Sequence, residues 1–507
     1  MAEGPIDALA RQRPLGAGPL VRTIVDVAGW EALAAELANG DAWSLLAHWA
    51  EPGAVHAAVL DARDGAVAVA TLICPANRFP SLGRRHAPAI RLERAIRDLH
   101  GIVADRAPDL RPWLDHGRWP LRHPLAPLPD APVAPPPYSF LVAEGEGLHK
   151  IPVGPVHAGI IEPGHFRFSA NGETVVRLEE RLGYVHKGIE SLWQHAPIDR
   201  ATRIAARISG DSTVATSFAF ARAVEAALGV AVPPRATWLR GLMAELERIA
   251  NHLGDIGAIC NDAAFTLMHA HCGVLRERVL RACAVAFGHR LMMDRIVPGG
   301  VALDPSDDGL AAIRSALGEI DGRFPQLIEL YDDTPSLQDR TVGTGALSTA
   351  LARQFAAGGY VGRASGRDFD ARRAVPYAPY DALVFDVPVR TQGDVDARVW
   401  VRILEVRESV RLVRAILDRL PDGPVQHDGV ARPNGVVSEG AAMVEGFRGD
   451  YFAWVRVDER GRIARAHVRD PSWFQWPLLE AVVEGNIVAD FPLCNKSFNC
   501  SYSGHDL

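Results

Sequence analysis

Residues 235–265 read RATWLRGLMAELERIANHLGDIGAICNDAAF and show a long helical pattern. Apolar side chains recur there at intervals of three and four, the spacing that places them on one face of an α-helix. The stretches 269–293 and 396–420 show similar amphipathic patterns. Such helices bury their apolar faces against one another, so we predict a helical bundle. The apolar stripe of the first helix consists of Leu242, Leu246, Ile249, Leu253 and Ile256.

Strand patterns lie on both sides of this predicted bundle. Residues 165–182, HFRFSANGETVVRLEERL, alternate around Asn171–Gly172, a dipeptide that strongly favours a hairpin turn. A second strand pair is predicted near 452–469. We therefore expect residues 138–507 to form a mainly α-helical bundle domain with marginal β-strands.

The N-terminal part mixes helix and strand signals. Residues 29–40, GWEALAAELANG, predict a helix closed by Gly40. Residues 54–73 predict two strands about an Arg-Asp-Gly turn, and residues 87–102 predict another helix. These elements indicate an α+β domain over residues 1–123.

A proline-rich segment separates the two parts. Residues 124–137 read PLAPLPDAPVAPPP. Because proline fixes φ and lacks an amide donor, this composition predicts an extended, semi-rigid linker.

Bulk composition excludes several functional classes. The 507 residues carry a formal net charge of −7, which argues against a nucleic-acid-binding surface. The sequence shows no secretory signal and no apolar run long enough for a direct membrane span, so we expect any membrane contact to come through partner subunits. The six cysteines form no CxxC motif, which predicts free thiols in a reducing compartment.

Several segments resemble known families. Residues 93–125, ERAIRDLHGIVADRAPDLRPWLDHGRWPLRHPL, resemble the C-type subunit of respiratory complex I, although His100 stands where an aromatic residue is usual. GPVHAGIIEPGHFRF (154–168) and RLGYVHKGIESL (181–192) resemble [NiFe]-hydrogenase large subunits and the related complex I D-type subunit.

Later motifs follow in the same family order. Among them are VEGFRGDYFAWVRVD and VRDPSWFQWPLLEAVVEGNIVADFPL. A C-type module ahead of a D-type module is similar to the large subunit of formate-hydrogenlyase-type (group 4) energy-converting hydrogenases. The resemblance implies a complex I C-type fold followed by a hydrogenase large subunit fold.

The resemblance also locates a metal site that has lost its ligands. In the nickel enzymes the segment matching ARISGDSTVA (206–215) carries Arg-x-Cys-Gly-x-Cys, and a second cysteine pair lies near the C-terminus. Thiolate sulfur suits nickel and iron, whereas a serine hydroxyl is a neutral, hard donor. We therefore predict no metal in this chain. The four degenerate metal positions are Ser209, Ser212, Ser501 and Gly504.

The resemblance points to a quinone or acceptor pocket at His157, in the GPxH motif. A histidine there can donate a hydrogen bond to a quinone oxygen, or it can simply support a turn beside Pro155. The complex I tyrosine that accompanies this histidine falls at about Ile198, which cannot hydrogen-bond. No tyrosine lies between residues 185 and 330, so the usual His/Tyr pair is broken.

Three charged residues are candidates by the same resemblance. Glu162 matches a proton-passing glutamate and would be partly buried, or it pairs with Arg167 or a neighbouring strand. Asp211 either caps the helix that follows it or lines the remodelled pocket. Arg448 matches an arginine that projects toward the metal pocket, and its alternative is an ion pair with Glu445 or Asp450.

Two other charged or metal-like patterns carry weaker signals. Residues 362–373, GRASGRDFDARR, place Arg363, Asp368, Asp370 and Arg372 close together, which is typical of a solvated or salt-bridged surface and less often of a functional site. His269 and His271 point about 200° apart on a helix, so they do not form a metal site.

The combined expectation is a peripheral-arm subunit of a complex I-like or energy-converting-hydrogenase-related oxidoreductase. It would couple electron transfer from a partner iron–sulfur subunit to a quinone or other small acceptor and to ion translocation. Its partners would be that small iron–sulfur subunit and membrane ion-translocating subunits, at the cytoplasmic face of the inner membrane. The alternatives are a non-catalytic structural coupling subunit and, third, a [NiFe] hydrogenase with altered ligands.

Overall fold

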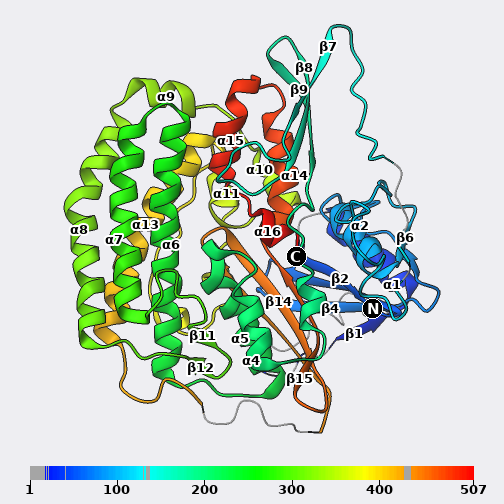
Figure 1. Ribbon diagram of the computed structural model, residues 1–507, viewed down its shortest axis with the longest axis horizontal. Coiled ribbons are helices and arrows are strands. Elements are labelled where there is room, and N and C mark those ends of the chain that lie inside the picture. The colour runs from blue at the N-terminus through cyan, green and yellow to red at the C-terminus, as the bar shows by residue number, and fades with distance from the viewer. Residues whose placement is uncertain are drawn as a thin grey trace.

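The computed structural model describes residues 18, 20, 22–39, 42–129, 131–132, 137–427 and 435–507. Figure 1 shows three groups of elements side by side: an N-terminal sheet, a central sheet that contains the strands near the C-terminal end of the sequence, and a layer of long helices. No helix within these ranges is long and apolar enough to cross a membrane.

The N-terminal sheet has the strand order β1-β4-β3-β2. The predicted strand pair is confirmed as β3 and β4, which are antiparallel. The two predicted helices are α1 and α2, and Gly101 ends α2 with φ 70°. Gly40, the expected end of α1, lies outside the described residues. The bounds are β1 Thr23–Val25, α1 Val27–Asn39, β2 Trp43–Glu51, β3 Ala54–Asp61, β4 Val67–Ile73, β5 Arg78–Pro80, α2 Ala89–His100 and β6 Val103–Asp105.

The described residues of the proline-rich segment, 124–129, 131–132 and 137, form no helix or strand. Side chains from both sides of this segment nevertheless share a hydrophobic core, in which Trp113 and Leu114 are buried with Phe166 and Trp476. The assignment of 1–123 and 138–507 as separate domains therefore stays a prediction.

The hairpin predicted at Asn171–Gly172 is confirmed. It joins β8 (His165–Asn171) to β9 (Thr174–Arg181), and β7 (Leu148–Val153) completes the sheet β7-β8-β9. Gly172 has φ 57°, a conformation that glycine adopts without steric cost. Figure 1 shows this sheet projecting from the rest of the molecule.

Long helices form the other side of the molecule, as predicted. The stripe on α6 is buried along its length, and α6 packs against α7 and α13 while α7 packs against α8 (Figure 1). The bounds are α5 Thr213–Leu228, α6 Pro234–Asp262, α7 Thr266–Phe287, α8 Asp307–Asp332 and α13 Val395–Arg419.

The central sheet has the order β10-β15-β14-β13 and lies in the interior, so the expectation of marginal strands is wrong for it. Alternate residues explain its position. Val444 and Val455 face the helical core, whereas Met443 and Trp454 pack with residues of the N-terminal sheet. Both faces are therefore apolar. The bounds are β10 Ala196–Pro197, β13 Ser438–Gly446, β14 Gly449–Val457 and β15 Arg462–Arg469.

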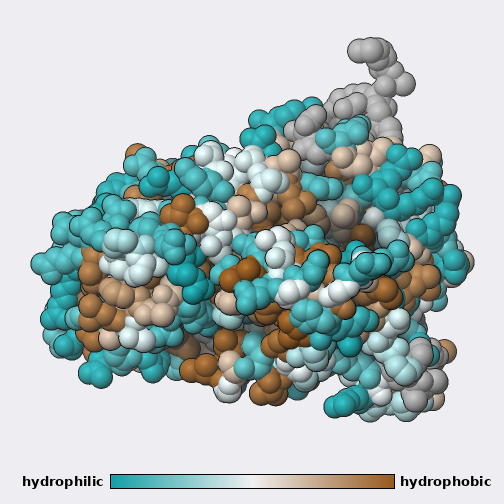
Figure 2. Space-filling view, turned by 90° about the horizontal axis from the view of Figure 1, so that it is seen from above, coloured by the Kyte–Doolittle hydropathy of each residue, from teal (hydrophilic) through white to brown (hydrophobic). Residues whose placement is uncertain are grey.

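Shorter elements connect these layers and carry much of the candidate site. They are α3 Ile189–Trp193, α4 Ile198–Ala205, β11 Ile296–Val297, β12 Gly300–Val301, α9 Pro335–Thr341, α10 Thr349–Gln354, α11 Gly359–Ala364, α12 Ala371–Ala374, α14 Ser472–Val483, α15 Phe491–Phe498 and α16 Tyr502–His505, with 3-10 turns at Gly210–Ser212, Tyr380–Ala382 and Val488–Asp490. Figure 2, which views the molecule from the top of Figure 1, shows hydrophobic patches between hydrophilic areas on that face.

Candidate functional site

The degenerate metal segment leads from α4 into α5. Ser209 is extended, and the 3-10 turn that follows it ends at Ser212. The Ser209 hydroxyl donates a hydrogen bond of 2.6 Å to Oδ1 of Asp211. The side chain of Ser212 is fully buried, and its hydroxyl lies close enough to Tyr451 to lower a phenol pKa that burial raises well above the usual value.

Asp211 does not cap α5, so that alternative is wrong. Two amides in the first turn of α5, those of Val214 and Ala215, donate instead to the carboxylate of Glu247, at 2.7 and 3.0 Å. Burial raises the pKa of Glu247 to about 8, although these amides oppose the shift. Asp211 is thereby left available for a different partner.

That partner is Arg448, from the turn between β13 and β14. Its two terminal nitrogens donate to Asp211 Oδ1 and Oδ2, at 3.0 and 2.5 Å. Burial opposes ionisation of Asp211, but the Arg448 guanidinium holds the pKa of that carboxyl below its usual value. The expected pairs of Arg448 with Glu445 or Asp450 are not formed, because Glu445 binds Arg363 and Asp450 binds Arg469.

The C-terminal segment meets this pair. The Ser501 hydroxyl donates to the Ser209 hydroxyl at 3.3 Å and accepts the amide hydrogen of Gly504 at 2.9 Å. Three of the four degenerate positions are thus joined by hydrogen bonds, although 292 residues separate the two serines. Ser212 lies apart from this chain of bonds, beside Tyr451.

These residues do not fit a nickel–iron centre. A Cβ at Gly504 would overlap Oδ2 of Asp470, so a cysteine side chain has no room there. The nearby thiols of Cys494 and Cys500 are both buried, and burial raises the pKa of Cys494 to about 12 and that of Cys500 well above its usual value. Over the described residues, no group of three or more His, Cys, Asp or Glu side chains could hold a metal ion.

His157 gains a tyrosine partner that sequence reasoning missed. Its Nε2 lies 3.4 Å from the hydroxyl of Tyr502, the first residue of α16. Gly164 makes this approach possible, since a Cβ there would lie 2.6 Å from the Tyr502 ring. His157 is half-buried, and Ile198, where the resemblance placed the tyrosine, contributes an apolar side chain elsewhere. No local sequence signal relates two residues so far apart in the chain.

Glu162 is exposed, so the expectation of a partly buried carboxylate is wrong. It does not pair with Arg167, whose guanidinium lies over the ring of Phe140. Its Oε2 accepts the backbone amide hydrogen of Ser503 at 3.0 Å. Glu162 therefore lies at the solvent edge of the α16 segment.

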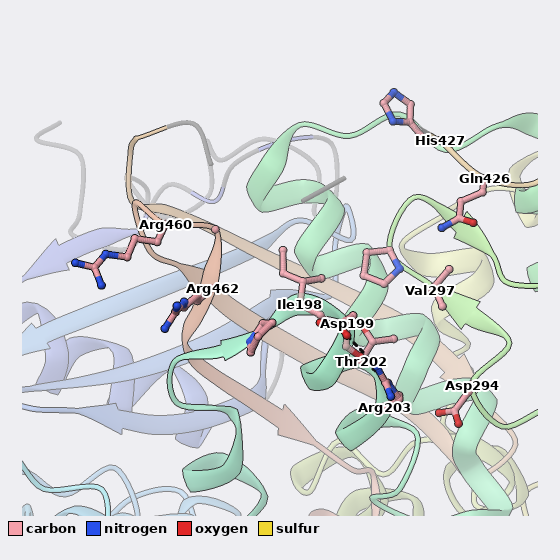
Figure 3. Close-up of a pocket in the computed structure, with 13 residues that line it drawn as sticks. Ile198, Asp199, Thr202, Arg203, Asp294, Val297, Gln426, His427, Arg460 and Arg462 are labelled. Carbon is pink, nitrogen blue, oxygen red and sulfur yellow. Dashed lines mark hydrogen bonds and ion pairs between the residues drawn. The ribbon is translucent and has the colours of Figure 1, made fainter. Parts of the chain in front are cut away.

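A cavity of about 700 Å³ lies beside Ile198 but contains none of the other predicted site residues. Figure 3 shows Arg460 and Arg462 on one side of it and Gln426 and His427 on the other. Its α4 side chains include the exposed ion pair of Asp199 and Arg203.

The predicted charge cluster is mostly buried, so its interpretation as a solvated surface is wrong for three members. Arg363, Asp370 and Arg372 are buried, whereas Asp368 pairs with Arg373 at the surface. Burial of charge requires close partners. Arg363 contacts Glu405 and Glu445 at 2.6 and 2.9 Å, and Arg372 contacts Glu245 at 2.9 Å.

Comparison with known proteins identifies the family of this chain. The family model described as the 49 kDa subunit of respiratory-chain NADH dehydrogenase matches residues 262–434 and 427–506. Formate hydrogenlyase subunit 5 of Escherichia coli is 30% identical over 442 residues, covering 84% of this chain and 77% of that protein. A D-type subunit of the NADH-quinone oxidoreductase of Koribacter versatilis is 30% identical over 363 residues, covering 67% of this chain and 90% of that protein.

A solved structure shows a similar fold. A chain of the membrane-bound sulfane sulfur reductase, an archaeal respiratory membrane complex, matches with a TM-score of 0.67 and 26% identity, over 72% of this chain and all of that one. The sequence motifs, the fold and these relatives agree. The chain belongs to the family of energy-converting hydrogenase large subunits and 49 kDa (D-type) subunits of respiratory NADH dehydrogenases.

Proposed function

We propose that this chain is a peripheral-arm subunit of a membrane-associated oxidoreductase complex in which a quinone, or a similar small acceptor, is reduced beside His157 and Tyr502. One observation carries the proposal. Three consecutive residues of the C-terminal segment each contact one residue of the candidate site: Ser501 contacts Ser209, Tyr502 contacts His157, and the Ser503 amide contacts Glu162.

This arrangement suits the reduction of an acceptor by outside electrons. The His157 imidazole and the Tyr502 hydroxyl are hydrogen-bond donors that can stabilise charge developing on a carbonyl oxygen. The loop that carries His157 also exposes Val156 and Ile160, which suits an apolar acceptor. Because the residues here do not fit a nickel–iron centre, electrons would come from an iron–sulfur cluster in a small partner subunit.

The relatives support the wider setting. Two of them are named as subunits of formate hydrogenlyase and NADH-quinone oxidoreductase, and the similar structure is named as a membrane complex. We propose that membrane ion-translocating subunits bind this chain and hold it peripherally at the cytoplasmic face. The Asp211–Arg448 pair would maintain the shape of the pocket behind the acceptor.

A structural coupling role is the second candidate. The observation that favours it is the close packing of the former metal positions, where the Ser209, Ser212 and Ser501 side chains are all buried. Under this proposal side chains fill the former metal site, and the chain transmits conformational changes without binding a substrate.

Turnover by the purified complex tests the proposal. We expect reduction of a short-chain quinone and a loss of at least about tenfold in kcat for Tyr502→Phe, because the hydroxyl beside His157 is removed. Tyr184→Phe is the matched control, since Tyr184 is exposed. Unchanged turnover in Tyr502→Phe would favour the structural role. Stoichiometric nickel in the purified chain would contradict both candidates.

A further inference from the structure

A second polar cluster lies where α2, β9 and α14 meet. Arg91 of α2 contacts Glu180 of β9 at 3.1 Å and Glu480 of α14 at 2.8 Å. Oε1 of Glu480 also accepts the backbone amide hydrogen of Glu180 at 2.7 Å. Two carboxyl groups therefore share one guanidinium.

The neighbouring cations have other partners. Among the described residues, Arg91 is the only guanidinium that contacts Glu180 and Glu480 directly. Glu179, the next residue on β9, is matched by Arg111. Arg94 binds Asp109, the Tyr138 hydroxyl and the carbonyls of residues 111 and 112. Arg111 also binds Asp109 and the carbonyl of residue 139, and Arg181 binds the carbonyls of residues 112, 113 and 115.

The burial of this cluster disfavours two negative charges at one guanidinium. The Glu180 side chain is 0% exposed, and its Oε1 has no hydrogen-bond partner within the described part of the chain. Two ionised carboxylates at one buried guanidinium would leave an uncompensated charge, which is strongly unfavourable in a low-dielectric interior. In support, burial and then the charge of Glu480 raise the pKa of Glu180 well above its usual value. Both the geometry and the raised pKa favour a shared proton over full ionisation of the pair.

The cluster lies between solvent and the proposed acceptor site. The Glu480 side chain is 23% exposed, so it can take up a proton from water. On the other side, α14, which carries Glu480, packs against both β9 and α16, and the ring of Trp476 on α14 lies 4.8 Å from that of Tyr502. The Glu180 charge adds to the rise that burial gives the Tyr502 pKa. Tyr502 in turn lies 3.4 Å from Nε2 of His157.

We propose that Arg91, Glu180 and Glu480 form a buried proton store that supplies the acceptor through Tyr502 and His157. This inference rests on the proposed function. A quinone takes two electrons from the partner's iron–sulfur cluster and two protons. Tyr502 passes its hydroxyl proton by way of His157 to one quinone oxygen and recovers a proton from Glu180 through an ordered water bound at Oε1. Glu480 restores that proton from solvent, and the second proton enters at the exposed edge near Glu162.

Infrared spectra of the assembled wild-type complex, from which the spectrum of each variant complex is subtracted, test proton storage independently of turnover. Wild type should show the C=O band of a protonated, buried carboxyl group at neutral pH. Glu180→Gln and Glu480→Gln should each remove the same component of that band, because either change leaves one carboxyl facing one guanidinium, and that carboxyl then ionises. The component from Glu247, whose pKa burial raises to about 8, should remain. Glu173→Gln is the matched control, because Glu173 is exposed near the tip of the same hairpin. The proposal would be overturned if the wild-type-minus-variant spectra of both cluster variants showed no lost carboxyl component.

Turnover tests delivery of the proton. In Glu180→Gln we expect kcat for a short-chain quinone to fall at least about tenfold with KM unchanged. We expect the wild-type rate to fall at alkaline pH, where Glu180 loses its proton, and this fall should be absent from the pH profile of Glu180→Gln. Unchanged kcat and pH profile would overturn the relay. If both cluster variants lose the carboxyl component but the wild-type complex reduces no quinone, the acceptor assignment fails while the proton store stands, so the two failures are distinguishable.

Discussion

The Asp211–Arg448 pair and the Arg91–Glu180–Glu480 cluster are built from the same chemical groups in different ratios. In the first, one carboxylate meets one guanidinium, and the pKa of Asp211 is lowered. In the second, two carboxyl groups meet one guanidinium, and the pKa of Glu180 is raised. In these two clusters the direction of the carboxyl pKa shift follows the ratio of acid to base.

The largest expected effect comes from breaking the Asp211–Arg448 pair. Asp211→Asn leaves the guanidinium of Arg448, which is 2% exposed, without its counter-ion, and this should destabilise the surrounding structure by about 3 kcal/mol. Hydrogen exchange of the α5 amides in the purified complex measures the local opening free energy. The double variant Asp211→Asn/Arg448→Met should recover part of the loss. An equal or larger loss in the double variant would contradict the pairing.

A smaller effect tests how tightly the former metal position is packed. Gly504→Ala should cost about 2 kcal/mol, because its Cβ would overlap the Asp470 carboxylate. Gly318→Ala is the control, since Gly318 lies within α8 with open space at its Cβ, and it should stabilise by about 1 kcal/mol. The thermal unfolding midpoint of the complex measures both changes. Equal tolerance of the two alanines would show that the Gly504 position is roomy.

The pH dependence of stability separates the two clusters. The raised pKa of Glu180 means that its stabilising contribution is present below the unfolded-state value and is lost as pH rises through the folded-state value. One proton gives a slope of about 1.4 kcal/mol per pH unit within that window, which Glu180→Gln should remove. The Asp211 contribution has the opposite sign and is lost as pH falls through its lowered pKa. The measurement is the free energy of unfolding against pH in wild type, Glu180→Gln and Asp211→Asn. If the slopes that the two substitutions remove had the same sign, the comparison would be contradicted.

The smallest expected effect comes from the Ser209 hydroxyl, which binds the Asp211 carboxylate of the Asp211–Arg448 pair. Ser209→Ala removes the 2.6 Å hydrogen bond to Asp211 and should cost about 1 kcal/mol. Because the two side chains interact directly, the same substitution should cost less in an Asp211→Asn background. A double-mutant cycle on α5 hydrogen exchange gives this coupling, and strict additivity would mean that the bond contributes nothing.

Elements with a strong local period could be predicted from the sequence. The stripe on α6 and the turn at Asn171–Gly172 needed no knowledge of distant contacts. The interior position of β13 to β15 could not be foreseen, because apolar residues on both strand faces become informative only when both covering layers are known. Likewise, the charges at Arg363 and Arg372 resemble a surface in sequence, and only their distant partners on α6, α13 and β13 make burial possible.

In the candidate site, too, sequence motifs predict some residues but not the contacts between distant segments. Motifs located Ser209, Ser501, His157 and Arg448, and the structure brings Ser209 and Ser501 into contact. The sequence could not supply Tyr502 as the partner of His157 or Asp470 beside Gly504, since both contacts join segments without a shared motif. Glu162 was misjudged because family position does not determine exposure.

The location of Arg91 on α2 has a consequence for recombination between relatives. A helix beside the N-terminal sheet supplies the cation, while Glu180 and Glu480 lie after the proline-rich segment. Trp113 likewise donates from the N-terminal side to His505 of α16. We expect a chimera that exchanged only the first part of the gene to lose these contacts, because their partner side chains lie in the part that was not exchanged.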